Sequence, residues 1–187
     1  RAAHRALRAE GVCYTEWTAW RAGGAEGIRR RLQSAGFTEV QVYWPYPTPV
    51  APRLWLPGQT PRAPYRYLVN LLFAGNHVIH RAARAALPDM LRIAVQIGCT
   101  PHLCAIAYTS SAHAQDVFEL VRAEWSRAHI EPNASGLSFL VRTGGARITS
   151  KLNLAVFSGS DAQPRWIVKL PRSADAAAAL QRERRPP

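Results

Sequence analysis

The stretch that decides the fold is residues 136–170, GLSFLVRTGGARITSKLNLAVFSGSDAQPRWIVKL. Three apolar or alternating runs in it predict three consecutive antiparallel strands, at residues 137–142, 151–157 and 166–168. Glycine-containing tripeptides at residues 143–145 and 159–161 predict the two turns between these strands. The segment therefore predicts a three-stranded meander in which Lys169 ends the third strand.

A glycine turn between strands one and two, with a lysine at the end of strand three, is typical of a kinase small lobe. The glycines let the backbone approach a phosphate closely, and the lysine supplies a point charge to it. The pattern alone leaves a second interpretation open, which is an ordinary β-meander with a surface lysine.

The segments VRTGGARITSKLNLAVF and WIVKLPR resemble the N-terminal region of the aminoglycoside phosphotransferase family, the small kinases and kinase-like proteins of bacteria. In that family the lysine contacts nucleotide phosphates and a glutamate of the next helix pairs with it. The resemblance implies that Lys169 pairs with Glu183, on a helix capped near Ser173, and that Gly144 and Gly145 approach the phosphates of ATP with magnesium. This glycine turn is looser than a full G-x-G-x-x-G, and the two catalytic aspartates of such kinases would lie further downstream.

The first half of the chain predicts a different arrangement. Helical patterns cover residues 1–9 and 24–35, and apolar extended runs follow them at residues 12–17 and 37–44. Alternation of helix and strand at this spacing predicts an α/β sheet. A further apolar run at residues 102–109 is expected to join the same sheet.

The segments AHRALRAEGVCYTEW and LQSAGFTEVQVYW resemble two segments of class I S-adenosylmethionine-dependent methyltransferases. The resemblance implies that residues 1–44 are the distal, substrate-side half of that fold and that the methyl donor binds mainly upstream. Ala9-Glu10 departs from the proline and glycine usual in the family, and no G-x-G-x-G occurs in the sequence. Glu16 and Trp17 end a predicted strand, where they face a substrate or, as the alternative, Trp17 packs in the core and Glu16 is solvated.

Two insertions are predicted within this half. Residues 45–64 hold seven prolines, which favours an ordered loop or extended linker, excludes helix and counts against a central strand. Residues 65–87 predict one helix and Pro88 starts a second, ending before Gly98. A packed helical hairpin is the first interpretation, and a lid near the active site or a membrane surface is the alternative. A last helix at 111–128 is expected to pack on the meander.

Charge leaves a second class of function open. The formal net charge is +12, so a basic nucleic-acid-binding module is the alternative hypothesis. Arginine is spread evenly along the chain, which counts against this hypothesis, and only Lys151 and Lys169 among the 24 basic residues are lysines. That bias resembles coding in a GC-rich genome. The three cysteines are expected to be unpaired thiols in the cytoplasm, and no metal site is predicted.

Together these features predict an α/β chain, α+β overall, with a partial Rossmann-like methyltransferase sheet followed by a three-stranded antiparallel, kinase-like meander. The expected domains are residues 1–110, with insertions at 45–64 and 65–98, and residues 111–187. We expect a fragment of a bifunctional bacterial transferase that acts on a small molecule or glycan. The fragment itself is expected to be inactive, and no catalytic residue is assigned. A third hypothesis, an interaction or scaffold protein, is supported only by the proline-rich stretch.

Overall fold

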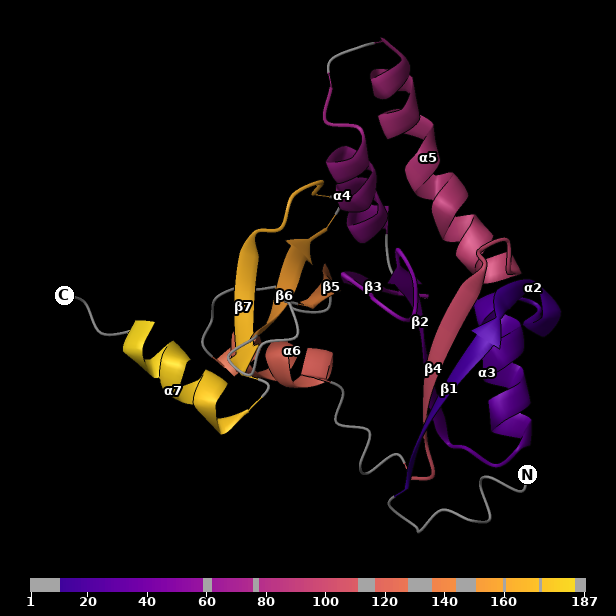
Figure 1. The fold of residues 1–187 in the computed structure, drawn as a ribbon, viewed down its shortest axis with the longest axis horizontal. Helices are drawn as coiled ribbons and strands as arrows, with labels where there is room; N and C mark the ends of the chain where they lie inside the picture. Colours follow the sequence, from indigo (N-terminus) through magenta and orange to yellow (C-terminus); the bar gives the residue numbers. More distant parts are fainter. Residues whose placement is uncertain are drawn as a thin grey trace.

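The computed structural model describes residues 11–58, 62–75, 78–110, 117–127, 136–143, 151–159, 161–171 and 173–183. The strands are β1 (Val12–Thr18), β2 (Glu39–Tyr46), β3 (Leu54–Pro57), β4 (His102–Tyr108), β5 (Leu137–Thr143), β6 (Lys151–Ser158) and β7 (Trp166–Pro171). The helices are α2 (Ala19–Ala22), α3 (Gly24–Ser34), α4 (Arg62–Leu72), α5 (Val78–Ile97), α6 (Val117–Arg127) and α7 (Ala174–Glu183). The result is a mixed α/β fold (Figure 1).

The described strands form one seven-stranded sheet in the order β1-β4-β2-β3-β5-β6-β7, and every neighbouring pair is antiparallel. The prediction that the extended runs at residues 12–17, 37–44 and 102–109 share a sheet is confirmed, because β4 lies between β1 and β2. Since β4 is antiparallel to both neighbours, β1 and β2 run parallel, and α2 and α3 connect them. The helix predicted at residues 1–9 lies outside the described residues.

The predicted meander is also confirmed, as β5, β6 and β7. The third strand is longer than predicted and continues to Pro171, so Lys169 lies within the strand and not at its end. Lys169 therefore has a cross-strand neighbour, Asn153 of β6, on the same face of the sheet.

The proline-rich segment differs from the prediction. It contains the end of β2, the whole of β3 and the first turn of α4. Pro45 is tolerated in β2 because pairing with β4 stops at Tyr43, so its missing N–H costs no bond to that strand. Pro64 is tolerated because the first turn of a helix contains N–H groups without intrahelical partners. β3 pairs with β5 through Trp55 and its neighbour Leu54, which makes the sheet continuous.

The helical hairpin is confirmed, but its break is not where the sequence placed it. α4 ends at Leu72, and α5 runs from Val78 through Pro88 to Ile97. At Gly75 an added Cβ would lie 2.3 Å from His80 Nδ1, so any larger residue here would require the His80 ring to move. The Arg84 guanidinium donates to the Gly75 carbonyl at 3.3 Å and helps to close the connection.

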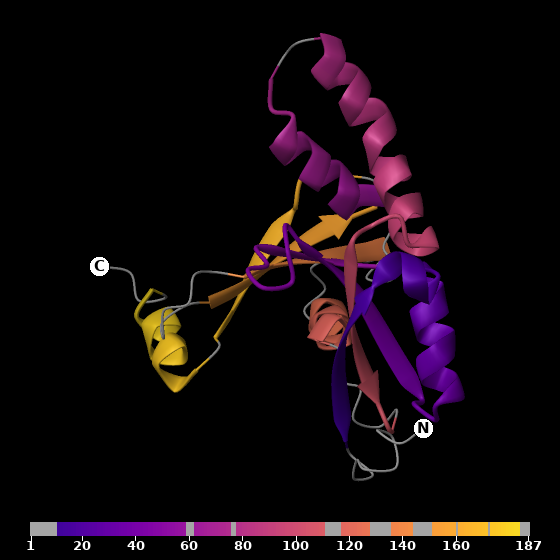
Figure 2. The same cartoon turned by 45° about the vertical axis from the view of Figure 1, so that its right-hand side comes forward.

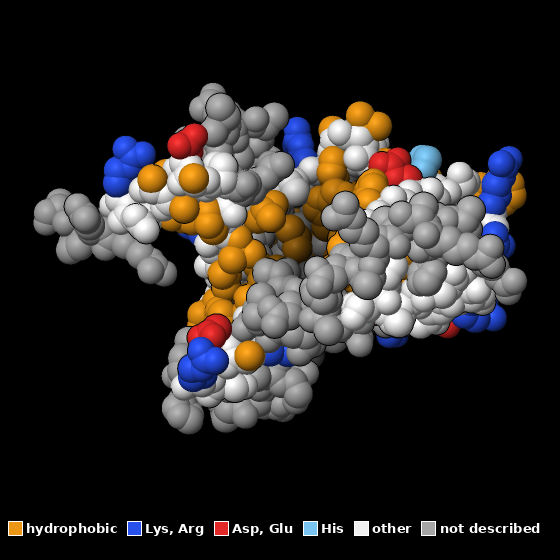
Figure 3. Space-filling model, turned by 90° about the horizontal axis from the view of Figure 1, so that it is seen from below, with side chains coloured by type: hydrophobic (Ala, Val, Ile, Leu, Met, Phe, Trp, Pro, Cys, Tyr) orange, Lys and Arg blue, Asp and Glu red, His pale blue; other side chains and the backbone are white. Residues whose placement is uncertain are grey.

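Helices cover the two faces of the sheet unequally. In Figure 2 the hairpin α4–α5 lies above the strands and α6 lies below them. The larger core contains Ile28 of α3, Leu68 of α4 and Val95 of α5, packed against one face of the sheet. The smaller core packs Val121 and Trp125 of α6 against the opposite face of β5, β6 and β7, as predicted for this helix. Figure 3 views that lower side, where hydrophobic side chains gather in a hollow near the middle.

Candidate functional site

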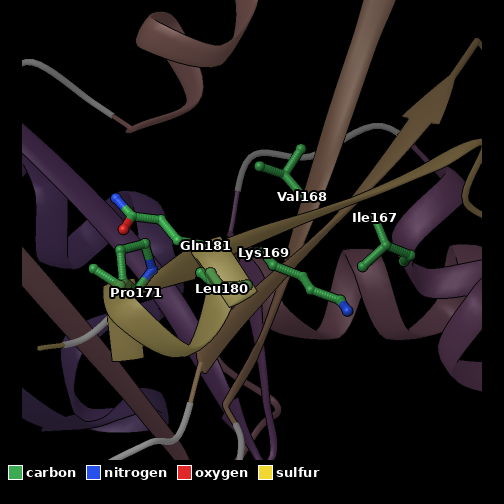
Figure 4. A pocket seen from close by; sticks show the side chains of 7 residues that line it. Ile167, Val168, Lys169, Pro171, Leu180 and Gln181 are labelled. Atoms are coloured by element: carbon green, nitrogen blue, oxygen red, sulfur yellow. The ribbon is translucent and has the colours of Figure 1, made fainter. Parts of the chain in front are cut away.

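A cavity of about 610 Å³ lies between β7 and α7, next to Lys169 (Figure 4). Its walls come from Ile167, Val168, Lys169 and Pro171 of β7 and from Ala177, Leu180 and Gln181 of α7. Strand alternation exposes Lys169 and Ile167 on one face, while Trp166 and Val168 turn to the smaller core. The cavity thus presents one amine and one amide among apolar walls.

The start of α7 is fixed close to the strand that carries Lys169. The Ser173 hydroxyl accepts a hydrogen bond from the Ala176 N–H at 3.2 Å, which confirms the predicted N-cap. Ala176 itself is fully buried, so the first turn of α7 is packed as well as capped. Because only two residues separate β7 from α7, this cap also fixes the position of the cavity wall that α7 contributes.

A polar row crosses the meander on the face that carries Lys169. Arg142 of β5 pairs with Asn153 of β6, and Asn153 pairs with Lys169 of β7. Side chains directly opposite one another in a sheet lie on the same face, with Cβ atoms about 4.5–5.5 Å apart. The row therefore offers a guanidinium, an amide and an amine, which are all hydrogen-bond donors to an anion. Arg142 and Asn153 were missed in the sequence because their role depends on strand register.

The other residues predicted for this site, Gly144, Gly145 and Glu183, are not described by the structure or are described only in their backbone. Gly144 and Gly145 lie outside the described residues. Glu183 is the last residue of α7, and its side chain is also outside them. The Lys169–Glu183 pair therefore stays a prediction. The residue of α7 that does line the cavity is Gln181, and in Figure 4 the Lys169 amine is directed to the Ile167 side, away from it.

The second predicted pair, Glu16 and Trp17, does not form one site. Consecutive residues of β1 point to opposite faces of the sheet. Trp17 packs against the larger core, and its indole N–H donates to Thr15 Oγ1 at 2.8 Å. Glu16 is exposed on the other face, where its Oε1 accepts from the Tyr14 hydroxyl at 3.0 Å. The core-packing alternative is thus the correct one for Trp17.

Glu16 instead belongs to a small cluster that the sequence did not reveal. The Tyr14 hydroxyl also lies 3.1 Å from Cys104 Sγ on β4, next to Glu16 in register. Partial burial, the hydrogen bond with Cys104 and the nearby Glu16 charge raise the pKa of Tyr14 well above its usual range. Burial also raises the pKa of the Cys104 thiol, and the Tyr14 hydrogen bond only partly offsets this. A thiol held protonated is a poor nucleophile, so no nucleophilic role is assigned to Cys104.

Comparison of the chain with family models, curated proteins and solved structures finds no match. Among the residues that the structure describes, no three His, Cys, Asp or Glu side chains come close enough together to hold a metal ion. In the same part of the chain, no helix combines the length and the apolar composition needed to cross a bilayer.

Proposed function

We propose that this chain is part of a transferase in which residues 111–187 bind nucleotide phosphates through Lys169. The observation that carries the proposal is the position of Lys169, at the cavity between β7 and the capped helix α7. A strand lysine followed by a capped helix is the arrangement that the resemblance to aminoglycoside phosphotransferases implies. Full phosphoryl transfer is proposed only for the intact protein.

The polar row supports phosphate as the ligand. Lys169 and Arg142 are both basic and lie on the same face of the meander, with Asn153 between them in register. The connection from Thr143 to Lys151 joins β5 to β6 at the strand ends next to Arg142 and Asn153. In the proposed function, the glycines of that connection and the two cations approach the same phosphates from different sides.

ATP and magnesium fit this site differently. The amine, guanidinium and amide of the polar row suit phosphate oxygens, which accept hydrogen bonds and carry negative charge. No carboxylate is among the described residues that line the cavity, and magnesium in phosphate sites is usually held by carboxylates. The residues of this chain therefore account for holding the phosphates, and we derive no step through the metal.

For residues 1–110 we propose the substrate-side half of a methyltransferase domain. The three strands that the resemblance assigns to that half, β1, β2 and β4, are neighbours in the sheet, and α3 covers one of its faces. In α/β sheets of this kind, ligands bind beyond the carboxyl ends of the strands. The resemblance assigns no contact with S-adenosylmethionine to a residue of this sequence, so no methyl-transfer step is assigned to residues of this chain.

The test is a titration of the purified chain with ATP and with ADP, followed by calorimetry. We expect Lys169→Ala to weaken nucleotide binding at least tenfold, about 1.4 kcal/mol, with an unchanged circular dichroism spectrum. Arg127→Ala is the matched control, because it also removes one positive charge, from an exposed position on α6. Equal affinities of wild type and Lys169→Ala would refute the proposal, and a similar loss in Arg127→Ala would reduce it to nonspecific charge attraction.

A further inference from the structure

One side of α5 carries an exposed line of apolar side chains, which we name the α5 stripe. Its members recur every three or four residues and are Ile79, Ala82, Ala86, Met90, Ile93 and Ile97. The exposed fraction is 78% for Ile79, 61% for Met90 and Ile97, and 48% for Ile93. Pro88 and Val95, the buried residues of α5, lie on the opposite side of the helix by its 3.6-residue period.

The α5 stripe is long and continuous. From Ile79 to Ile97 it extends for about 27 Å at 1.5 Å per residue. Three more apolar side chains of the hairpin are exposed, Leu71 and Leu72 at the end of α4 and Val78 at the start of α5. Figures 1 and 2 both show the hairpin projecting from the sheet, with its far end clear of the other described elements. An exposed apolar surface of this extent marks an interaction site.

The charges of the hairpin decide what can cover the stripe. Residues 62–98 contain five arginines and one acidic residue, Asp89. Asp89 is already neutralised, because its carboxylate lies 3.0 Å from the Arg62 guanidinium and 4.0 Å from that of Arg92. With five arginines and one aspartate, the hairpin carries a formal net charge of +4, which complements an anionic partner.

We propose that the α5 stripe lies in the interfacial layer of a membrane rich in anionic lipids. A helix with an apolar face and arginines on the remaining surface binds in this way, with the apolar side chains among the upper acyl groups and the cations near the phosphates. A second copy of the chain fits the stripe less well, because each copy carries a formal net charge of +12 and two hairpins would bring like charges together. The site is separate from the Lys169 cavity, so it does not depend on the proposed nucleotide binding.

The experiment is flotation of the full chain with two kinds of vesicle, one of phosphatidylcholine alone and one of phosphatidylcholine and phosphatidylglycerol in equal parts. We expect binding to the anionic vesicles that weakens as salt is raised, and at least tenfold weaker binding to the neutral ones. The variant Ile93→Gln should reduce binding, and the double variant Met90→Gln with Ile93→Gln should reduce it at least tenfold. Both positions are exposed, so folding is expected to be unchanged by circular dichroism.

Val12→Gln is the matched control, because the exposed fraction of Val12, 53%, is close to the 48% of Ile93 but Val12 lies on β1, away from both the stripe and the Lys169 cavity. Wild-type binding in this control supports the stripe as the membrane contact. The proposal is overturned if the chain binds neither vesicle, or if the stripe variants bind as tightly as wild type. It is equally overturned if sedimentation velocity shows a wild-type dimer that Ile93→Gln dissociates, because the stripe would then be covered by a second copy.

Discussion

Replacing Phe157 with alanine tests whether the two predicted halves of the chain share one core. Phe157 lies on β6 and is fully buried. Its ring meets the Tyr67 ring of α4 edge to face, with centroids 5.7 Å apart. It also belongs to the same hydrophobic cluster as Ile28 of α3 and Leu103 of β4, which come from the first half of the chain. Loss of this ring should therefore destabilise the elements on both sides of the predicted domain boundary.

The expected cost follows from complete burial. Truncation of a buried phenylalanine to alanine lowers the free energy of unfolding by about 3–5 kcal/mol, which includes the cavity left behind. Loss of the edge-to-face pair adds about 0.5–1.5 kcal/mol. We therefore expect a loss of about 5 kcal/mol, a large part of the roughly 5–15 kcal/mol that stabilises an ordinary domain.

The assay is urea unfolding followed in parallel by far-ultraviolet circular dichroism and tryptophan fluorescence. Both signals should move together to lower urea by at least about 1 M, given a slope of about 1–3 kcal/mol per molar. Tyr67→Phe is the control, since it keeps the ring and removes only the hydroxyl that accepts from Arg142 at 3.5 Å. Two separate transitions, with only one shifted by Phe157→Ala, would contradict the shared core. So would a total loss below about 1 kcal/mol, the size of one ordinary hydrogen bond.

Three further predictions concern local features. Burial, and then its hydrogen bonds, raise the pKa of Tyr14 above its ordinary value of 10.0, so the folded state binds this proton more tightly than the unfolded state does. Above pH 10 the free energy of unfolding should therefore fall more steeply with pH in wild type than in Tyr14→Phe, as measured by urea unfolding. Gly159→Ala, at φ +56° with nothing within 4 Å, should cost about 1–2 kcal/mol in thermal unfolding, and Gly98→Ala, at φ +86° with a backbone oxygen 2.7 Å from the new Cβ, should cost clearly more. Iodoacetamide with peptide mapping should label exposed Cys99 first and buried Cys104 only after denaturant is added; early labelling of Cys104 would contradict its burial.

Local patterns were sufficient to predict most elements. Alternation of apolar residues and glycine turns correctly located the three strands of the meander, because each side chain in a strand faces either a core or solvent. The helix over 24–35 and the cap at Ser173 were also predicted, since capping and amphipathic spacing are properties of a few adjacent residues.

Proline was the least reliable local signal. Pro88 indicated a helix start, but α5 continues through it with Val95 and Leu91 in contact with the larger core. Packing of the helix against the core stabilises it by more than the loss of one backbone hydrogen bond costs. The extent of this packing cannot be predicted from the sequence alone. The same holds for Pro45, whose tolerance in β2 depends on which strands are its neighbours.

The sequence by itself determined where strands and helices form and which face of each is apolar, because these follow from periods of two and 3.6 residues. Only the tertiary structure decided that β3 joins the two predicted halves into one sheet, through the short pairing of Leu54 and Trp55 with β5. It also decided that Arg142, Asn153 and Lys169 stand in one row, since register depends on pairing between segments far apart in the chain. The physical reason is that burial and pairing are properties of several segments together, whereas periodicity is a property of one.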